Sequence, residues 1–191
     1  MHFTLSDLVT DITQNAAESE AALVELEVRE SDKGPGGYPE FRFTVKDNGK
    51  GMDPGELKRA IDPFVTDGKK HPNRKVGLGI PFLIQTADQS GGGWDLRSEK
   101  NAGTTVSAWF DTGNVDTPPV GDIPGMFRTI LLFSGPGEIC IRRIKEGTVK
   151  RNYEVHKSEL MEALGNLEDA ESQILLARYL ASMEEDDGHG G

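Results

Sequence analysis

The most informative stretch of the sequence is Asp47-Asn48-Gly49-Lys50-Gly51-Met52. It follows residues 41–45, in which apolar and polar side chains alternate as in a half-buried strand. Glycines at 49 and 51 allow the backbone to approach a ligand closely and to adopt positive φ. A carboxylate fixed at a strand end, here Asp47, can accept a hydrogen bond from an exocyclic amine such as that of adenine. Asp-Asn-Gly is also typical of a hairpin turn, so this stretch alone leaves both interpretations open.

The composition fits one globular domain with a small appendage. The 191 residues are 36% hydrophobic, which is enough for a core. The formal net charge of −11 argues against a sequence-independent grip on nucleic acid or an anionic membrane, because both need a basic surface. A single cysteine excludes an internal disulfide, and the sequence shows neither a signal peptide nor a long apolar run. We therefore expect a cytoplasmic location.

Residues 4–22 have the spacing of an amphipathic helix, with apolar side chains on one face. Asp11 and Asn15 are four residues apart, so they lie on one face of this helix beside the apolar stripe. A carboxylate and an amide in this arrangement can hold a divalent metal ion and a water molecule. The alternative interpretation is an ordinary solvated helix face.

The residues around this glycine-containing stretch predict a pair of strands, two helices with a lid between them, and a second pair of strands. Residues 23–29 and 41–45 favour an antiparallel pair of strands, and residues 53–61 a short helix. The polar residues 67–75 are locally basic, as in a lid that carries cations for phosphate; a solvated loop is the alternative. Gly77 and Gly79 precede an apolar helix at 81–89, where backbone amides can bind phosphate. Two further strands are expected at 94–98 and 104–110.

In this order, the motifs resemble those of the histidine kinase, gyrase, Hsp90 and MutL type of ATPase. The resemblance runs from about Leu5 to Phe110. Residues 11–18 resemble the family's N box, and Asp47-Asn48-Gly49-Lys50-Gly51 its first glycine box. The other three matches are Asp62-Pro63-Phe64-Val65-Thr66 (phenylalanine box), Gly77-Leu78-Gly79-Ile80 (second glycine box) and Gly103-Thr104-Thr105 (final Gly-Thr element).

The resemblance implies an α+β fold, a two-layer α/β sandwich in which helices cover one face of a mixed sheet. It also implies ATP and Mg²⁺ as cofactors. Asp47 would bind the adenine amino group, supported by Thr104 or Thr105, and Asn15 would coordinate magnesium. The other expected nucleotide-binding residues are Gly49, Gly51, Lys75, Gly77, Leu78 and Gly79.

Two positions depart from the family pattern. Many members that hydrolyse ATP carry glutamate where Asp11 stands, and histidine kinases often carry asparagine there. Aspartate keeps the charge but is one methylene shorter, so Asp11 is the candidate catalytic base. Lys75 stands where the second glycine box usually has a further glycine, and it either contacts phosphate or changes how the lid closes.

The C-terminal third predicts a small β/α extension. We expect an ATP-binding domain at 1–112, a linker at 113–125, an extension at 126–183 and a disordered acidic tail at 184–191. Within the extension, the pattern favours strands at 128–133, 138–144 and 149–155, then helices at 157–164 and 167–183. Cys140 lies between two isoleucines and is expected in the core, and His156 is expected to be an ordinary surface residue at a helix start.

Three functions fit these patterns. The first is a Mg-ATP-dependent phosphotransferase or ATPase that lacks the phosphoacceptor hairpin of sensor kinases, because the N box begins close to Met1. The second is a regulatory module that binds ATP without consuming it and docks a protein partner. The third is an anti-sigma-type serine kinase. We also expect a protein partner or phosphoacceptor, whose identity the sequence does not reveal, and none of the three functions requires nucleic acid or a membrane.

Overall fold

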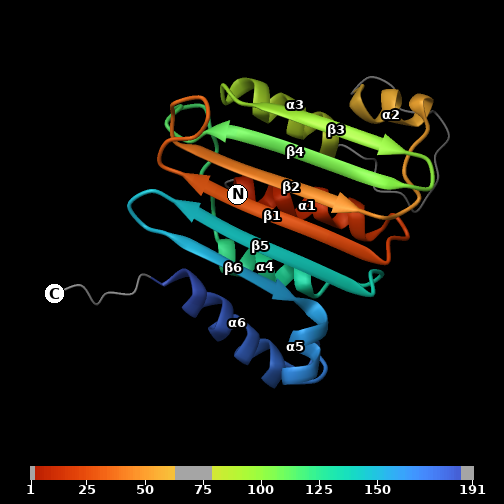
Figure 1. Cartoon of the computed structure of the whole chain (residues 1–191), viewed down its shortest axis with the longest axis vertical. Coiled ribbons are helices and arrows are strands. Elements are labelled where there is room, and N and C mark those ends of the chain that lie inside the picture. Colours follow the sequence, from red (N-terminus) through yellow and green to blue (C-terminus); the bar gives the residue numbers. More distant parts are fainter. Residues whose placement is uncertain (1–2, 63–78, 186–191) are drawn as a thin grey trace.

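The computed structural model describes residues 3–62 and 79–185, which form an open mixed sheet with helices on one face (Figure 1). The strand order is β3-β4-β2-β1-β5-β6. Of the neighbouring pairs in this described sheet, β1 and β5 are parallel and the other four pairs are antiparallel. This confirms the expected fold class. The strands are β1 (Leu23–Ser31), β2 (Glu40–Asp47), β3 (Gly93–Glu99), β4 (Gly103–Asp111), β5 (Glu138–Glu146) and β6 (Arg151–His156). The helices are α1 (Leu5–Ala17), α2 (Pro54–Ile61), α3 (Gly79–Gln89), α4 (Ile123–Leu131), α5 (Lys157–Leu164) and α6 (Ala170–Glu184).

Helix α1 begins at a capping box and lies behind the strands in Figure 1, together with α3 and α4. The backbone N–H of Asp7 donates to the Thr4 hydroxyl, and the backbone N–H of Thr4 donates to the Asp7 carboxylate. Leu8 and Ile12 are buried on the face that packs against the sheet. The helix ends at Ala17, earlier than the expected residue 22, because a turn with Glu20 at positive φ redirects the chain into β1.

The two central strands form the antiparallel pair that the alternating pattern predicts. Residues Val24, Leu26 and Val28 of β1 point to the helix-covered face, while the charged side chains between them point to the other face. Strand β2 buries Phe41, Phe43 and Val45 in the same layer. On its other side β2 pairs with β4, and this register places Asp47 directly opposite Thr104.

The prediction of a strand at residues 128–133 is wrong, because residues 128–131 are the last part of helix α4 and the chain leaves the helix at Leu132. Asp122 caps the helix by accepting from the backbone N–H of Gly125 at 2.9 Å, and Pro124 lies in the first turn. Phe127, Ile130 and Leu131 are completely buried at helical spacing. The β-branched and aromatic residues of this segment favour a strand locally, but the cap and the three- and four-residue spacing favour a helix.

Helices α5 and α6 are found where the sequence predicts helices. Leu176 and Leu180 of α6 are completely buried, and α6 packs against α4 below the sheet in Figure 1. On the other side of α6, Ile174 and Tyr179 are 55% and 42% exposed. Among the described residues, the helices are all too short or too polar to cross a membrane.

A buried arginine joins the last helix to the sheet. Arg143 of β5 is 1% exposed, and its guanidinium donates to Glu30 of β1 at 2.6 Å and to Glu184 of α6 at 3.0 Å. The hydroxyl of Tyr153 also donates to Glu184, at 2.6 Å. A buried charge is tolerated only where its hydrogen-bonding groups are satisfied, so this network fixes the end of α6 against β5 and β6.

The substitution Arg143→Met should lower the free energy of unfolding by roughly 3 kcal/mol, because it leaves Glu30 and Glu184 without the cation they share. The matched control is Arg29→Met in β1, where the exposed pairs with Glu27 and Glu146 contribute less than about 1 kcal/mol. Urea unfolding measures both changes. Equal losses in the two variants would contradict the structural role assigned to Arg143.

Candidate functional site

The glycine-containing stretch between β2 and α2 is held in place by neighbouring backbone groups. The side-chain oxygen of Asn48 accepts from the backbone N–H groups of Ala22 and Leu23, both at 2.9 Å. The backbone N–H of Lys50 donates to the carbonyl of Ser19 at 2.9 Å. The stretch is therefore tied to the end of α1 and to the start of β1, and it is not a simple hairpin turn.

The same stretch is fixed on its other side by the β3–β4 connection. The Ser98 hydroxyl accepts from the backbone N–H of Met52 at 2.8 Å, and it lies 2.8 Å from the Thr104 hydroxyl. The carbonyl of Lys50 accepts from the backbone N–H of Asn101 at 2.7 Å. The end of α1, the start of β1 and the β3–β4 connection thus together determine the conformation of residues 47–52.

Asp47 lies at the end of β2 and is only 6% exposed. Its Oδ1 accepts from the Ser19 hydroxyl at 3.1 Å and from the backbone N–H of Gly49 at 2.8 Å. Burial raises the pKa of Asp47, although these two donors and the backbone of Thr104 act in the opposite direction. A carboxylate that is buried and oriented in this way is suited to accept a hydrogen bond from a ligand amine.

The register between β2 and β4 distinguishes the two candidate threonines. Thr104 is opposite Asp47 and therefore points to the same, helix-covered face of the sheet. Thr105 is opposite Lys46 and points to the other face. The structure thus brings Thr104 next to Asp47 and separates Thr105 from it.

Gly49 and Gly51 are required by close packing inside the protein. A Cβ atom at Gly49 would lie 2.1 Å from the Ser19 hydroxyl oxygen. Gly51 has φ of +59°, and a Cβ atom there would lie 1.9 Å from the carbonyl oxygen of Glu99. Their role as direct nucleotide contacts stays a prediction, and their role in shaping the loop follows from these distances.

Asn15 and Gly79, from two different sequence motifs, lie side by side. A Cβ atom at Gly79, the first residue of α3, would lie 3.3 Å from the side-chain nitrogen of Asn15. Asn15 and Asp11 are both exposed on the same face of α1, as the spacing of four predicts. The N-terminal end of α3 therefore meets the polar face of α1, where backbone amides and an amide side chain converge.

An open hollow of about 700 Å³ adjoins this meeting point. Asp11 and Gly79 both line it, whereas Asp47 and Thr104 are not among its described lining residues. The remaining described lining residues are Ile61, Pro81, Phe82, Ile84, Gln85, Asp88 and Gln89. The hollow thus extends away from the Asp47 end of the site, toward α2 and the exposed side of α3.

Several predicted site residues lie outside the described residues. These are Lys75, Gly77 and Leu78, together with residues 63–66 of the expected phenylalanine box and the basic residues Lys69, Lys70 and Arg74. Their roles remain predictions from the sequence. Within residues 3–62 and 79–185, the structure brings Asp47 close to Thr104 and Gly49, and Asn15 close to Gly79.

Two serines that the sequence does not predict as site residues, Ser19 and Ser98, position the candidate site. Ser19 donates to Asp47 and packs against Gly49, and Ser98 joins Met52 to Thr104. Ser19 follows the end of α1, and Ser98 is an ordinary polar residue of a strand. Neither position carries a spacing or a motif that predicts contact with residues 47–52, so only the folded chain reveals it.

The expectation that Cys140 belongs to the core is wrong. The strand alternation buries Ile139 and Ile141 and turns Cys140 to the opposite face of β5, where it is partly exposed beside His156. Burial, followed by the charges of nearby glutamates, raises the pKa of the Cys140 thiol to about 11. At neutral pH the thiol therefore carries its proton and is a poor nucleophile.

The chain is similar to a known protein family and to solved structures. A family model described as histidine kinase-, DNA gyrase B-, and HSP90-like ATPase matches residues 3–114, more than half of the chain. Among solved structures, the ATPase domain of Aquifex aeolicus MutL complexed with ADP is similar, at 15% sequence identity and a TM-score of 0.33. This match covers 76% of the present chain and 62% of the MutL chain.

The substitution Gly51→Ala should destabilise the protein by roughly 2 kcal/mol more than Gly37→Ala. Both glycines have positive φ, but a Cβ atom at Gly37 meets nothing within 4 Å, whereas at Gly51 it meets the Glu99 carbonyl. Chemical unfolding of the two variants isolates the effect of close packing from that of φ. Equal destabilisation would show that the loop does not depend on this contact.

The substitution Asp47→Asn should raise stability relative to the wild type as the pH increases. Burial raises the pKa of Asp47, so with rising pH the unfolded chain loses this proton before the folded chain does, and the wild type is destabilised. The effect begins at the ordinary pKa of an aspartate, where the unfolded chain ionises, and is complete once Asp47 has ionised in the folded protein. Urea unfolding from about pH 3 to pH 7 measures it.

The opposite sign is expected for the control Asp32→Asn. Hydrogen bonds from the backbone N–H and the hydroxyl of Thr148 lower the pKa of Asp32. The wild type should therefore gain stability relative to Asp32→Asn as the pH rises. A difference of the same sign in both variants would contradict the environments assigned to the two carboxylates.

Proposed function

Because the chain belongs to the histidine kinase-, DNA gyrase B- and HSP90-like ATPase family, which implies ATP binding, we propose that it uses Mg-ATP as a phosphotransferase or ATPase. The observation that carries this proposal is the environment of Asp47. Its carboxylate is buried, oriented by Ser19 and Gly49, and placed beside Thr104 at the end of β2. A site of this kind selects a ligand that presents an amine to a carboxylate in an apolar setting.

In this proposal Asp47 accepts a hydrogen bond from the adenine amino group, and Thr104 supports the same edge of the base. The Ser98 hydroxyl holds Thr104, and the Ser19 hydroxyl holds Asp47, so both groups are oriented before the ligand arrives. Such orientation lowers the entropy that binding has to overcome. Thr105 is not assigned this role, because its side chain points to the other face of the sheet.

The phosphates are proposed to lie where α1 meets the start of α3. Two residues here can contact Mg²⁺ and phosphate. Asn15 offers an amide oxygen to the metal ion, and Gly79 has no side chain that would keep a phosphate away from its backbone. Asn15 would hold Mg²⁺, which neutralises phosphate charge when bound. Lys75, Gly77 and Leu78 would complete the phosphate contacts according to the sequence motifs.

Asp11 is the proposed general base. It is one helical turn from Asn15 and lines the hollow, so an attacking water molecule or acceptor hydroxyl can reach its carboxylate. The side chain accepts the proton of the attacking group and later returns it to solvent. Whether the acceptor is water, a histidine or a serine of a partner decides between ATPase, histidine-kinase-like and anti-sigma-type activity.

A second function, an ATP-gated module that binds a protein partner, is favoured by exposed apolar side chains on helices α5 and α6. Ile174, Leu175 and Tyr179 of α6 and Met161 of α5 are each more than 40% exposed. Exposed apolar residues on neighbouring helices are common at protein interfaces. In this function, nucleotide binding would change partner affinity while the ATP remains intact.

The proposal is tested with ATP labelled on the γ-phosphate and the purified full chain. We expect Asp47→Asn to weaken ATP binding by about 100-fold, because a charge-assisted hydrogen bond is lost. We expect Asp11→Asn to bind ATP like the wild type but to release or transfer label at least about 100-fold more slowly. Thr104→Val should weaken binding more than Thr105→Val does.

The outcomes separate the possible functions. Label found as free phosphate or on protein, and lost in Asp11→Asn, supports an enzyme. Label that stays in bound ATP, alone and with candidate partners, supports the ATP-gated module. Unchanged ATP affinity in Asp47→Asn, in a variant that unfolding shows to be stable, would contradict the site assignment itself.

A further inference from the structure

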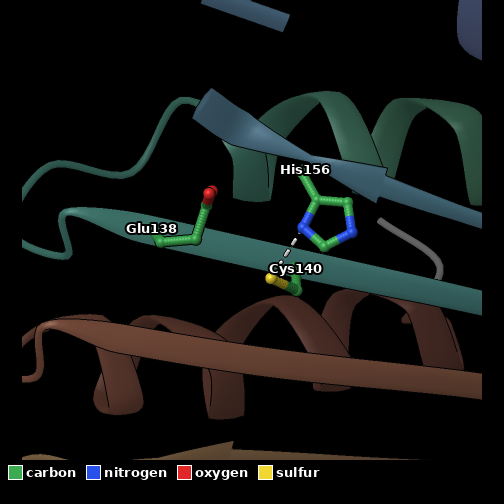
Figure 2. A group of neighbouring side chains, drawn as sticks. All are labelled: Glu138, Cys140 and His156. Atoms are coloured by element: carbon green, nitrogen blue, oxygen red, sulfur yellow. Dashed lines mark hydrogen bonds between the residues drawn. The ribbon is translucent and has the colours of Figure 1, made fainter. Parts of the chain in front are cut away.

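Three side chains with metal-binding atoms lie together on the sheet face opposite α1. The register of β5 and β6 places Cys140 directly opposite His156, and Glu138 is two residues before Cys140 on the same strand. All three side chains therefore point to one face. Figure 2 shows Cys140 and His156 facing each other from neighbouring strands, with Glu138 beside them. One sulfur, one nitrogen and one oxygen atom of this group lie within 4.8 Å of one another.

The imidazole of His156 is oriented for coordination. Its Nε2 lies 2.8 Å from a carboxylate oxygen of Glu154, a distance at which the neutral ring donates from Nε2 and keeps the Nδ1 lone pair toward Cys140. The Cys140 sulfur is 3.1 Å from Nδ1. A carboxylate that holds the far nitrogen of a histidine is the usual arrangement at metal sites, because it fixes the ring and increases its basicity.

The carboxylate of Glu138 is oriented as well. Its Oε1 accepts from the backbone N–H groups of Ile139 and Ser158 at 3.0 Å and 3.1 Å, and its Oε2 accepts from the Ser158 hydroxyl. A carboxylate has about four lone-pair positions, so these bonds leave capacity for a metal ion. Nearby Glu25 and Glu154 add negative charge around the sulfur, which favours a cation.

We propose that Glu138, Cys140 and His156 form a binding site for a thiophilic divalent cation, with Zn²⁺ as the best match. One thiolate, one imidazole and one carboxylate, with water in the fourth position, is a ligand set typical of Zn²⁺. On binding, a sulfur–metal bond replaces the sulfur–hydrogen bond, the Nδ1 lone pair turns to the metal, and the thiol proton passes to solvent. This site is separate from the proposed ATP site, which lies on the helix-covered face.

The distances allow this with a small movement. A tetrahedral ion about 2.3 Å from sulfur and about 2.1 Å from nitrogen separates the two atoms by about 3.6 Å. The present separation of 3.1 Å has to increase by about half an ångström, which side-chain torsions provide. The bound cation would join β5 to the point where β6 ends and α5 begins, because His156 is the N-cap residue of α5. It would therefore stabilise the attachment of residues 156–185.

Cobalt substitution tests the proposal directly. The full chain, prepared without a histidine tag and freed of metal with a chelator, is titrated with Co²⁺ in the absence of oxygen. We expect a sulfur-to-cobalt charge-transfer band and the intense visible bands of four-coordinate Co²⁺, both abolished by an equivalent of Zn²⁺. Cys140 is the only cysteine, so any such band assigns it as a ligand.

Variants assign the other ligands. Cys140→Ser should lose the charge-transfer band, and His156→Gln should weaken Co²⁺ binding by at least about 100-fold. Glu138→Gln should also weaken binding, and Glu154→Gln should do so by about 10-fold through the orientation of His156. The matched control Glu146→Gln changes an exposed carboxylate at the far end of β5 and should leave Co²⁺ affinity unchanged. Circular dichroism and ATP binding verify that each variant is folded.

Two results would overturn the proposal. The first is a wild-type protein that shows no sulfur-to-cobalt band at a molar excess of Co²⁺. The second is equal Co²⁺ affinity in the wild type, Cys140→Ser and His156→Gln, which would indicate binding at other acidic residues. A rise in melting temperature with Zn²⁺ in the wild type, absent in Cys140→Ser, would support it independently.

Discussion

The buried carboxylate of Asp47 is the group on which the candidate ATP site depends. Its position requires β1 and β4 on either side of β2, the Ser19 hydroxyl after α1, and glycines that let the chain pass close to Ser19 and Glu99. Burial opposes ionisation of this group, so folding holds a carboxyl group largely away from water, among the polar groups of Ser19, Gly49 and Thr104. Family membership implies ATP as the ligand.

The two faces of the sheet have different chemistry. Alternation along β1 and β2, and along β5 as far as Ile141, sends mainly apolar side chains toward the helices and mainly polar ones to the opposite face. The helix-covered face carries Asp47 and Thr104 where β2 ends. The opposite face carries Glu138, Cys140 and His156. One sheet thus supports a proposed nucleotide site and a proposed metal site that do not compete for residues.

The last third of the chain is integrated with the first. Strand β5 pairs in parallel with β1, α4 contributes completely buried residues to the common core, and Arg143 connects β5, β1 and the end of α6. The proposed cation would reinforce this same region through His156. Strand β1 contacts both the glycine-containing stretch and β5, so the candidate ATP site and the C-terminal third share one central strand.

The sequence alone determined the fold class, the central hairpin, the polar face of α1 and the role expected of Asp47, because these depend on local periodicity and on ordered motifs. Two predictions from the sequence were wrong. Residues 128–133 have strand propensity, but the helical spacing of their buried side chains prevails. Cys140 has apolar neighbours, but the alternation of the strand turns its side chain to the other face. Only the tertiary structure distinguished Thr104 from Thr105 and placed Asn15 beside Gly79. It also revealed the contacts of Ser19 and Ser98 and the Glu138–Cys140–His156 group. These relations depend on strand register and on contacts between distant segments, which no local pattern encodes.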